Sequence, residues 1–239
     1  MKSLIKNMLI IILLVTSTSC VMNINGIKGN KNVITQNRNI PSDFVKINVS
    51  NGLDVLLTYG DEVSLTVEAD ENLHEYITTE VKNGILYISS KKNIVSAKAR
   101  RIYLSTLHIN EIKTTSGAEV SSENTIITEE LVLEATSGSD INLRVKVNNL
   151  SSETTSGADI KLIGEADNFS ARATSGSDIN AYDLKVNNCT AKVTSGADIK
   201  IHVIKKLDAK ATSGGDIKYK GNPKLLEQDE SSSGKVKRM

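Results

Sequence analysis

The sequence has no tryptophan, two phenylalanines and six tyrosines among its 239 residues. A core built from this chain must therefore be filled by aliphatic side chains. Cysteine is as scarce, with only Cys20 and Cys189. Cys20 lies at the end of an N-terminal targeting segment, so the chain cannot build an intrachain disulfide or a cysteine metal cluster. Its stability must come from packing and hydrogen bonds.

The chain also has no large excess of positive or negative charge. The formal net charge is +1, and removal of residues 1–19, with Lys2 and Lys6, changes it from +1 to −1. There is no basic tract, so we expect no nucleic-acid partner. After the N-terminal segment, no stretch is apolar enough to predict a transmembrane helix.

The first nineteen residues have the pattern of a secretory signal. Lys2 and Lys6 precede an apolar run, MLIIILLV, at residues 8–15. Eight residues are too few to cross a bilayer, which needs about 20, but they suit the apolar region of a signal peptide. Small residues, STS at 17–19, stand directly before Cys20. This order resembles the lipobox of bacterial lipoproteins, so we expect cleavage after residue 19 and a lipid on Cys20. An ordinary signal peptide with an incidental cysteine is the alternative.

One phrase, Thr-Ser-Gly-small-acid-aliphatic, dominates the rest of the chain. Its glycines are Gly117, Gly138, Gly157, Gly176, Gly196 and Gly214, which are 21, 19, 19, 20 and 18 residues apart. SSSGKVK reads as a degenerate seventh copy centred on Gly234. Self-similarity at a fixed period is the signature of a repeat architecture.

Period-two alternation accompanies the phrase in every repeat. One aliphatic column comprises Leu131, Leu150, Phe169, Cys189 and Leu207, and another Val120, Ile141, Ile160, Ile179, Ile199 and Ile217. This alternation predicts strands with one buried face. Nineteen residues are too few for a strand–helix–strand crossover, and the leucine spacing does not fit a leucine-rich repeat. We therefore predict an all-β fold, a right-handed parallel β-helix of about 19-residue coils, with equivalent residues stacked about 4.8 Å apart.

Within this fold the repeated phrase is a structural corner. Glycine supplies a backbone conformation that a Cβ resists, and the preceding Ser and Thr can hydrogen-bond to the backbone and to one another. The small residue after each glycine indicates tight packing. Cys189 occupies a core column, so we interpret it as an apolar filler and not as a nucleophile.

The acidic residue of the phrase would form a file of carboxylates along the stack: Glu119, Asp140, Asp159, Asp178, Asp198 and Asp216. Neighbours at 4.8 Å repel by roughly 0.9 kcal/mol in water. Asn142, Lys161, Asn180, Lys200 and Lys218 follow two residues later on the same face, and we expect them to offset this repulsion. A file of bound Ca²⁺ is the alternative, but the lysines and the need for six to eight oxygens argue against it. We predict no metal and no cofactor.

The remaining segments frame the repeats. We expect a tether over 20–41, a single β-helical domain over 42–222 and a polar cap or tail over 223–239. The domain divides into irregular coils at 42–112, which form an N-terminal β cap, and regular coils at 113–222. VSNGLDV at 49–55 is a looser corner phrase, and 70–76 reads as a loop or one helical turn.

Several motifs in order resemble a known family: GNKNVIT at 29–35, FVKINVSNGLDVLL at 44–57, VEADEN at 67–72, EVKNGILYI at 80–88 and the later TSGxDI copies. Together they are similar to the putative auto-transporter adhesin, head GIN domain family of bacterial lipoproteins. The resemblance covers residues from about 29 to about 220. It implies a right-handed parallel β-helical domain exported to the cell envelope, and it implies no catalytic residues.

These features favour a non-enzymatic lipoprotein, exported and held in the envelope by Cys20, with the outer membrane the favoured location. It would serve as an adhesin-like binding module or scaffold, with a glycan or protein ligand on its repetitive face. A polysaccharide lyase or hydrolase is one alternative, but every acid has similar surroundings, and His74, His108 and His202 have no nucleophile partner and are expected at the surface. Self-assembly through exposed strand edges is another alternative.

Overall fold

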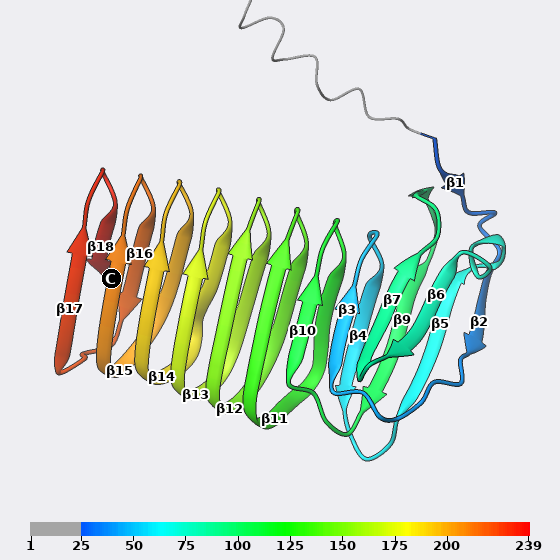
Figure 1. Ribbon diagram of the computed structural model, residues 1–239, viewed down its shortest axis with the longest axis horizontal. Helices are drawn as coiled ribbons and strands as arrows, with labels where there is room; N and C mark the ends of the chain where they lie inside the picture. The colour runs from blue at the N-terminus through cyan, green and yellow to red at the C-terminus, as the bar shows by residue number, and fades with distance from the viewer. Residues whose placement is uncertain (1–24) are drawn as a thin grey trace, which may run out of the picture.

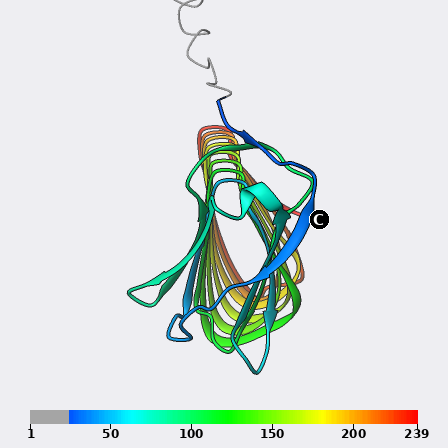
Figure 2. The ribbon, with the colours of Figure 1, turned by 90° about the vertical axis from the view of Figure 1, so that its right-hand side faces the viewer.

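The chain winds into a β-solenoid of about seven turns with coils of about 19 residues (Figure 1). The computed structural model describes residues 25–239; the expected signal peptide and Cys20 lie outside these residues. Viewed along the axis, each coil is narrow at the Thr-Ser-Gly corner and wider at the opposite, rounded end (Figure 2). No helix in the described part of the chain is long and apolar enough to span a membrane.

Five long strands form the regular part of the solenoid. Each begins just after one corner, bends around the rounded end and rises to the next corner: β11 (Glu119–Thr136), β12 (Asp140–Thr155), β13 (Asp159–Ala173), β14 (Asp178–Val193) and β15 (Asp198–Ala211). Consecutive strands pair in parallel. The strand segments that come before each corner in the chain form one sheet, which we call the front sheet. The segments that follow each corner form the other, which we call the back sheet, as they lie in Figure 1.

Shorter strands complete both sheets. The front sheet adds β3 (Lys46–Val49), β6 (Ile77–Lys82), β7 (Ile85–Ser90), β10 (Glu111–Thr114) and β17 (Leu225–Glu230). The back sheet adds β2 (Val33–Asn37), β4 (Asp54–Tyr59), β5 (Ser64–Asp70), β9 (Arg100–Thr106), β16 (Asp216–Lys220) and β18 (Lys235–Arg238). Outside them, β1 (Ile27–Lys28) pairs with β8 (Ile94–Ser96).

The two predicted core columns are vertical stacks. Ile141 pairs in register with Ile160, and Ile160 with Ile179; Leu150, Phe169 and Cys189 are stacked in the same way. All these side chains are almost completely buried. The prediction that residues about nineteen apart are vertical neighbours is confirmed, and so is the aliphatic core.

Each corner is a two-residue turn in which both residues have a left-handed backbone. In the third regular coil φ is 58° at Ser156 and 69° at Gly157, which are the signs of a type I′ turn. Gly157 N–H donates to the carbonyl of Ser175 in the next coil at 3.3 Å. A Cβ on Gly157 would meet nothing within 4 Å, so the glycine is needed for its conformation and not for space.

The residue after the glycine is buried, as its small size indicated. Ala118, Ser139, Ala158, Ser177 and Ala197 have no exposed surface. The buried hydroxyl of Ser177 donates to the carbonyl of Thr174 at 2.8 Å, and its oxygen lies 2.9 Å from Thr154 Oγ1. A hydroxyl is therefore tolerated in this tight position because the corner supplies its partners.

The seventh corner exists, but its alignment on Gly234 is wrong by one residue. Ser232 and Ser233 have φ of 50° and 66°, and Gly214 N–H donates to the carbonyl of Ser232. Ser233 therefore takes the position of the usual glycine. Gly234 takes the small-residue position, where a Cβ would lie 2.3 Å from the carbonyl oxygen of Ala211.

The irregular N-terminal half does not consist of longer coils placed one after another. Gly52 N–H donates to the carbonyl of Ser116 at 3.0 Å, and β3 and β4 pair directly with β10 and β11. The corner at Gly52 is thus the immediate neighbour of the corner at Gly117. The intervening chain crosses to the other side of the first coil, where β7 and β9 pair with β3 and β4.

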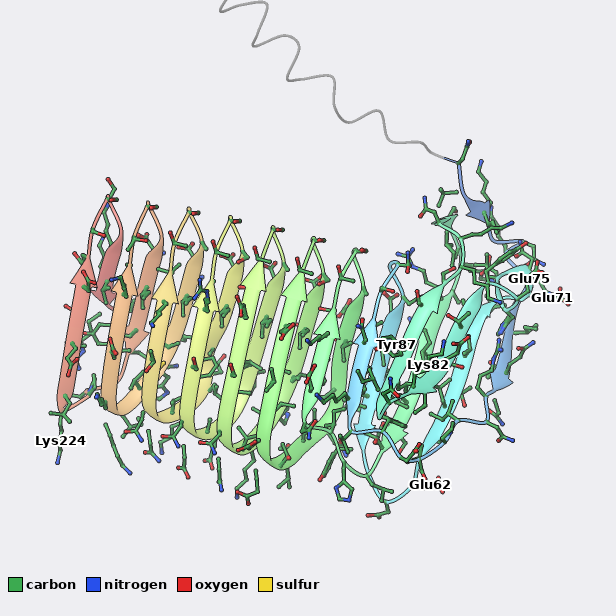
Figure 3. The ribbon with its side chains drawn as sticks, in the orientation of Figure 1. Glu62, Glu71, Glu75, Lys82, Tyr87 and Lys224 are labelled. Carbon is green, nitrogen blue, oxygen red and sulfur yellow. The ribbon has the colours of Figure 1, made fainter. Side chains whose placement is uncertain are left out.

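Antiparallel strands then close this end, which confirms the N-terminal β cap. β6 pairs with β7, β5 with β9 and β2 with β5, all antiparallel. A 3₁₀ turn, Glu71–Leu73, lies in the segment read as a loop or one helical turn. Figure 3 shows Glu71 and Glu75 at this end and Lys224 at the other.

Part of the expected tether is folded. Ile27–Lys28 and Val33–Asn37 are strands that pair with β8 and β5. The polar composition of residues 25–41 suggested a linker, but their asparagines bind the cap: Asn30 N–H donates to Asn72 Oδ1 at 2.8 Å. Residues 27–37, which we expected in the tether, therefore pack as part of the domain.

The C-terminal segment 223–239 forms a last coil with polar side chains on two of its inner positions. Gln228 and Glu230 pair in register with Ala209 and Ala211, which point inward. Glu230 Oε1 accepts the backbone N–H of Val236 at 2.6 Å. Inward-pointing polar groups of this kind blunt an open sheet edge.

Candidate functional site

The predicted carboxylate file lies on the back sheet directly after the corners. Register pairs Asp140 with Asp159, Asp159 with Asp178, and Asp178 with Asp198. Asp54 of β4, which pairs with Glu119, extends the file by one coil. It ends at Arg101 on one side and at Lys235 on the other, each in register with the last acid. Four of the acids, Asp140, Asp159, Asp178 and Asp198, line a groove with a volume of about 270 Å³.

Burial raises the pKa of Asp54, and two acids of the regular coils have a raised pKa as well. Burial raises the pKa of Asp140, and the neighbouring Asp159 and Glu119 charges raise it further. Burial also raises the pKa of Asp178, together with the charges of Asp159 and Asp198. Both acids are followed two positions later by asparagine, where Asp159, Asp198 and Asp216 are followed by lysine. The surroundings of the acids are therefore less uniform than the repeated phrase suggested.

The neighbouring column offsets the repulsion only in part. Asn142 Nδ2 donates to Glu119 Oε1 at 3.2 Å, and the charge of Lys200 lowers the pKa of Asp178. Among the described residues, however, none of the lysines in this column lies within 4.0 Å of an acid in the file. Residues 25–239 also contain no group of three or more His, Cys, Asp or Glu side chains arranged to hold a metal ion.

A second, larger groove lies on the front sheet and was not predicted. Its volume is about 550 Å³, and it crosses the coils from Glu130 to Lys206. One wall is a ladder of side-chain amides: Asn168 Nδ2 donates to Asn149 Oδ1, and Asn188 Nδ2 to Asn168 Oδ1, both at 3.0 Å. The other wall consists of small outward side chains, namely Val132, Ser151, Ser170 and Thr190. Each amide keeps a second N–H for a ligand.

The sequence contained a signal for this groove. Asn149, Asn168 and Asn188 recur at the coil period. Because successive coils are in register, amides at one position of the repeat must form a continuous track. Recurrence of a polar side chain at the coil period is therefore as informative as recurrence of an aliphatic one.

The histidines do not converge on a site. His74 is buried, which contradicts its expected surface position, and its Nε2 lies 3.2 Å from the carbonyl oxygens of both Ile34 and Ala69. It thus joins β2 to the end of β5 in the cap. His108 is exposed and His202 is half-buried. Cys189 is buried, and burial strongly raises the pKa of its thiol, in accord with a filler.

Two of the motifs that carry the family resemblance meet in the N-terminal cap. Asp70, from VEADEN, is fully buried. Its carboxylate accepts backbone N–H groups from Lys31 at 2.8 Å and from Lys98 and Ala99 at 3.0 Å each. Lys31 belongs to GNKNVIT, as does Gly29, whose missing side chain lets the backbone approach the carboxylate. These motifs are structural, and we call this contact set the Asp70 clamp.

Several solved structures have the same fold. A putative adhesin from Bacteroides fragilis superposes with a TM-score of 0.84 at 23% identity, covering 90% of this chain and all of the other. A putative lipid binding protein from Parabacteroides distasonis gives 0.74 at 22% identity, over 89% and 99%. A putative adhesin from Parabacteroides merdae gives 0.71 at 21% identity, over 89% and 98%. At these identities the likeness shows the fold alone.

No functionally curated protein matches the chain. The family model described as putative auto-transporter adhesin, head GIN domain, matches residues 43–223. This match covers well over half of the chain and includes the regular coils, both grooves and most of the cap. The chain therefore belongs to the putative auto-transporter adhesin, head GIN domain family.

Proposed function

We propose that this protein is a non-enzymatic binding module of the bacterial cell envelope, anchored by a lipid on Cys20, which binds an extended polymer along the front-sheet groove. The observation that carries the proposal is the amide ladder of Asn149, Asn168 and Asn188 along one wall of that groove. A ligand with one polar group per unit could make equivalent contacts in successive coils. The adhesin-like family supports a role in binding.

A carbohydrate fits this groove better than an acyl chain. Its walls carry the amides of Asn149, Asn168 and Asn188 and the hydroxyls of Ser151, Ser170 and Thr190 beside a larger area of carbon surface. These polar groups, which recur from coil to coil, suit a ligand rich in hydroxyl groups. Most apolar side chains of the solenoid are packed inside it, and Val132 of the groove wall is an exception. One structural neighbour is described as a putative lipid binding protein, so lipid vesicles belong in the test.

Binding is tested with an immobilised panel of neutral and acidic polysaccharides and with phospholipid vesicles. We expect retention on a polysaccharide without new reducing or unsaturated ends. Asn168→Ala should weaken retention, because it removes the central rung of the ladder. Asn180→Ala, on the back sheet, is the matched control and should bind as the parent does. Retention on none of the polysaccharides, or equal binding by both variants, would contradict the proposal.

The same assay addresses catalysis. New chain ends would indicate a polysaccharide lyase or hydrolase, and Asp178→Asn would then show whether the carboxylate file is responsible. Carboxylates in adjacent coils are close enough in principle for paired acid–base chemistry. The file lies on the other sheet from the amide ladder, so a single variant in each groove separates the two functions.

Anchoring is tested in cells. Radiolabelled fatty acid should be incorporated into the parent protein and not into Cys20→Ala. Protease treatment of intact cells then distinguishes a surface-exposed domain from one facing the periplasm. Absence of label in the parent would contradict the lipid anchor and leave the groove proposal standing.

A further inference from the structure

One outward column of the front sheet contains three cations in succession. Arg172 pairs in register with Lys192, and Lys192 with Lys210, so their side chains start about 4.8 Å apart. Like charges directly opposite each other on neighbouring strands are destabilising. The sequence nevertheless places all three there, and none of them is buried.

Elsewhere in the same sheet, lysines lie beside carboxylates. Lys113 Nζ lies 3.2 Å from a carboxylate oxygen of Glu111 and 3.0 Å from one of Glu134. Lys46 Nζ lies 2.8 Å from Glu111. Glu134 and Glu153 of the same column are also in register, so like-charged neighbours are not confined to the cation row. The row is nevertheless the place in this column where three like charges follow one another, and a local departure from charge pairing is expected where a surface has a function.

The unneutralised charge lies at the centre of the row. Arg172 Nε is 3.6 Å from Glu153 Oε1, and Lys210 Nζ is 2.6 Å from Asp229 Oδ2. Lys192, between them, has no carboxylate within 4.0 Å among residues 25–239. Its ammonium group is free to meet an anion from outside.

Hydroxyl groups complete the surroundings. The three cations line a shallow pocket of about 200 Å³ together with Thr194 and Thr212. Thr212 Oγ1 donates to Thr194 Oγ1 at 2.9 Å. A guanidinium, ammonium groups and the Thr194 hydroxyl converge on one pocket, and they are donors that a carboxylate or sulfate oxygen accepts.

The cation row runs alongside the amide ladder. Thr190, in the wall of the front-sheet groove, precedes Lys192 by two residues and points out of the same strand face. Both tracks follow the solenoid axis and repeat once per coil. A linear polymer that follows the axis can therefore bring acidic groups that recur along its chain to the cations of the row.

We propose that the cation row of Arg172, Lys192 and Lys210 binds the carboxylate or sulfate groups of an acidic polysaccharide whose chain follows the front sheet. This inference rests on the proposed binding of a polymer in the adjacent groove and names its chemical class. A linear arrangement along the axis fits a linear polyanion better than the headgroups of a membrane.

The test compares polygalacturonate, alginate and a sulfated glycan with a neutral β-1,4-glucan, using the full chain purified in detergent. Lys192→Ala is the informative variant, because Lys192 has no carboxylate partner to leave behind. We expect about tenfold weaker binding to the acidic polymers, with no loss of thermal stability and with partial rescue by Lys192→Arg. Lys146→Ala, an exposed lysine outside the row, should bind as the parent does. Added salt should weaken the acidic interaction.

The other outcomes separate the cation row, the glycan class and the polymer-binding function. Binding of the neutral glucan alone overturns the cation row and leaves the polymer-binding function intact. Equal acidic binding by the parent and Lys192→Ala also overturns the row. Binding of anionic phospholipid vesicles or inorganic phosphate through Lys192, with no acidic glycan bound, assigns the row to phosphate and overturns the glycan. Failure to bind any polymer overturns both proposals.

Discussion

Gly29 and Asp70 are 41 residues apart in the chain, and a Cβ on Gly29 would lie 1.9 Å from Asp70 Oδ2. The glycine therefore lets the backbone of the N-terminal segment pass directly over a buried carboxylate. Asp70 in turn gathers backbone N–H groups from Lys31, Lys98 and Ala99. The Asp70 clamp thus joins the N-terminal segment to β5 and to the loop before β9.

Asp70→Asn should destabilise the cap. The amide keeps one acceptor oxygen, but its NH₂ group faces backbone donors, and the charge that strengthened these hydrogen bonds is lost. We expect the free energy of unfolding of the cap to fall by about 2–4 kcal/mol. Hydrogen exchange over residues 27–37 measures this directly. Asp61→Asn, at an exposed position, is the control, and equal exchange in the two variants would disprove the clamp.

The clamp also predicts loss of stability in acid. Burial alone would raise the pKa of Asp70, but the N–H groups of Ala99, Lys31 and Lys98, with the charge of Lys98, outweigh it and lower the pKa below its ordinary value. Stabilisation by a group of this kind is complete above the ordinary carboxyl pKa and is lost as pH falls through the folded value. Thermal melts between pH 7 and pH 2 should show the parent converging on Asp70→Asn at the acid end.

The carboxylate file should behave in the opposite sense. Because burial and the charges of Asp159 and Glu119 raise the pKa of Asp140, its ionised form is disfavoured in the fold. Asp140→Asn should therefore stabilise the protein at neutral pH, by less than about 1 kcal/mol since the group is partly exposed. The gain should vanish as pH falls through the raised pKa, where the parent is protonated too. Destabilisation at pH 7 would show that the charge is needed.

At the corners, a substitution should cost stability through backbone conformation and not through steric crowding. Gly157→Ala should lose about 1–2 kcal/mol, the strain of a left-handed backbone with a Cβ, because nothing crowds that position. Ser156→Asn should stabilise the corner, since Asn-Gly is the preferred pair for a type I′ turn. Urea denaturation measures both. A larger loss in Gly157→Asn than in Gly157→Ala would contradict the conformational explanation.

Cys189 should be inert until the solenoid opens. Its side chain is buried, and burial strongly raises the pKa of the thiol, so little reactive thiolate forms in the folded state. Maleimide should label the peptide that contains Cys189 in denaturant and leave it unmodified in native buffer. Fast native labelling, mapped to that peptide by mass spectrometry, would exclude the filler interpretation.

The sequence predicted the regular coils well because their physics is local and repeated. Ile141 and Ile160 are neighbours in space for the same reason that they are similar in sequence: each coil must fit the next at every position. The small residue after each corner glycine was interpreted correctly from its size alone. The left-handed Ser156 was missed, because serine rarely adopts this conformation and only the paired turn requires it.

The cap could not be predicted in the same way. Nothing local shows that Gly52 lies against Ser116, because the chain between them makes a long excursion and returns. Asp70 resembled any acid in a polar loop, and only the assembled cap shows its three backbone donors. The front-sheet groove lies between these cases: its asparagines recur visibly, but the hollow beside them depends on the small side chains of the neighbouring column.

The pairing pattern also determines how this molecule carries mechanical load. Tension along the axis is shared between adjacent coils by hydrogen bonds around nearly the whole circumference, as between β12 and β13. A pull arriving through the N-terminal residues first meets β1, a two-residue strand with an irregular register to β8. The short strand yields before the coils do, and it leaves the Asp70 clamp as the next point of resistance. A molecule held at its N-terminus under flow would thus extend around β1 while its front sheet keeps its shape.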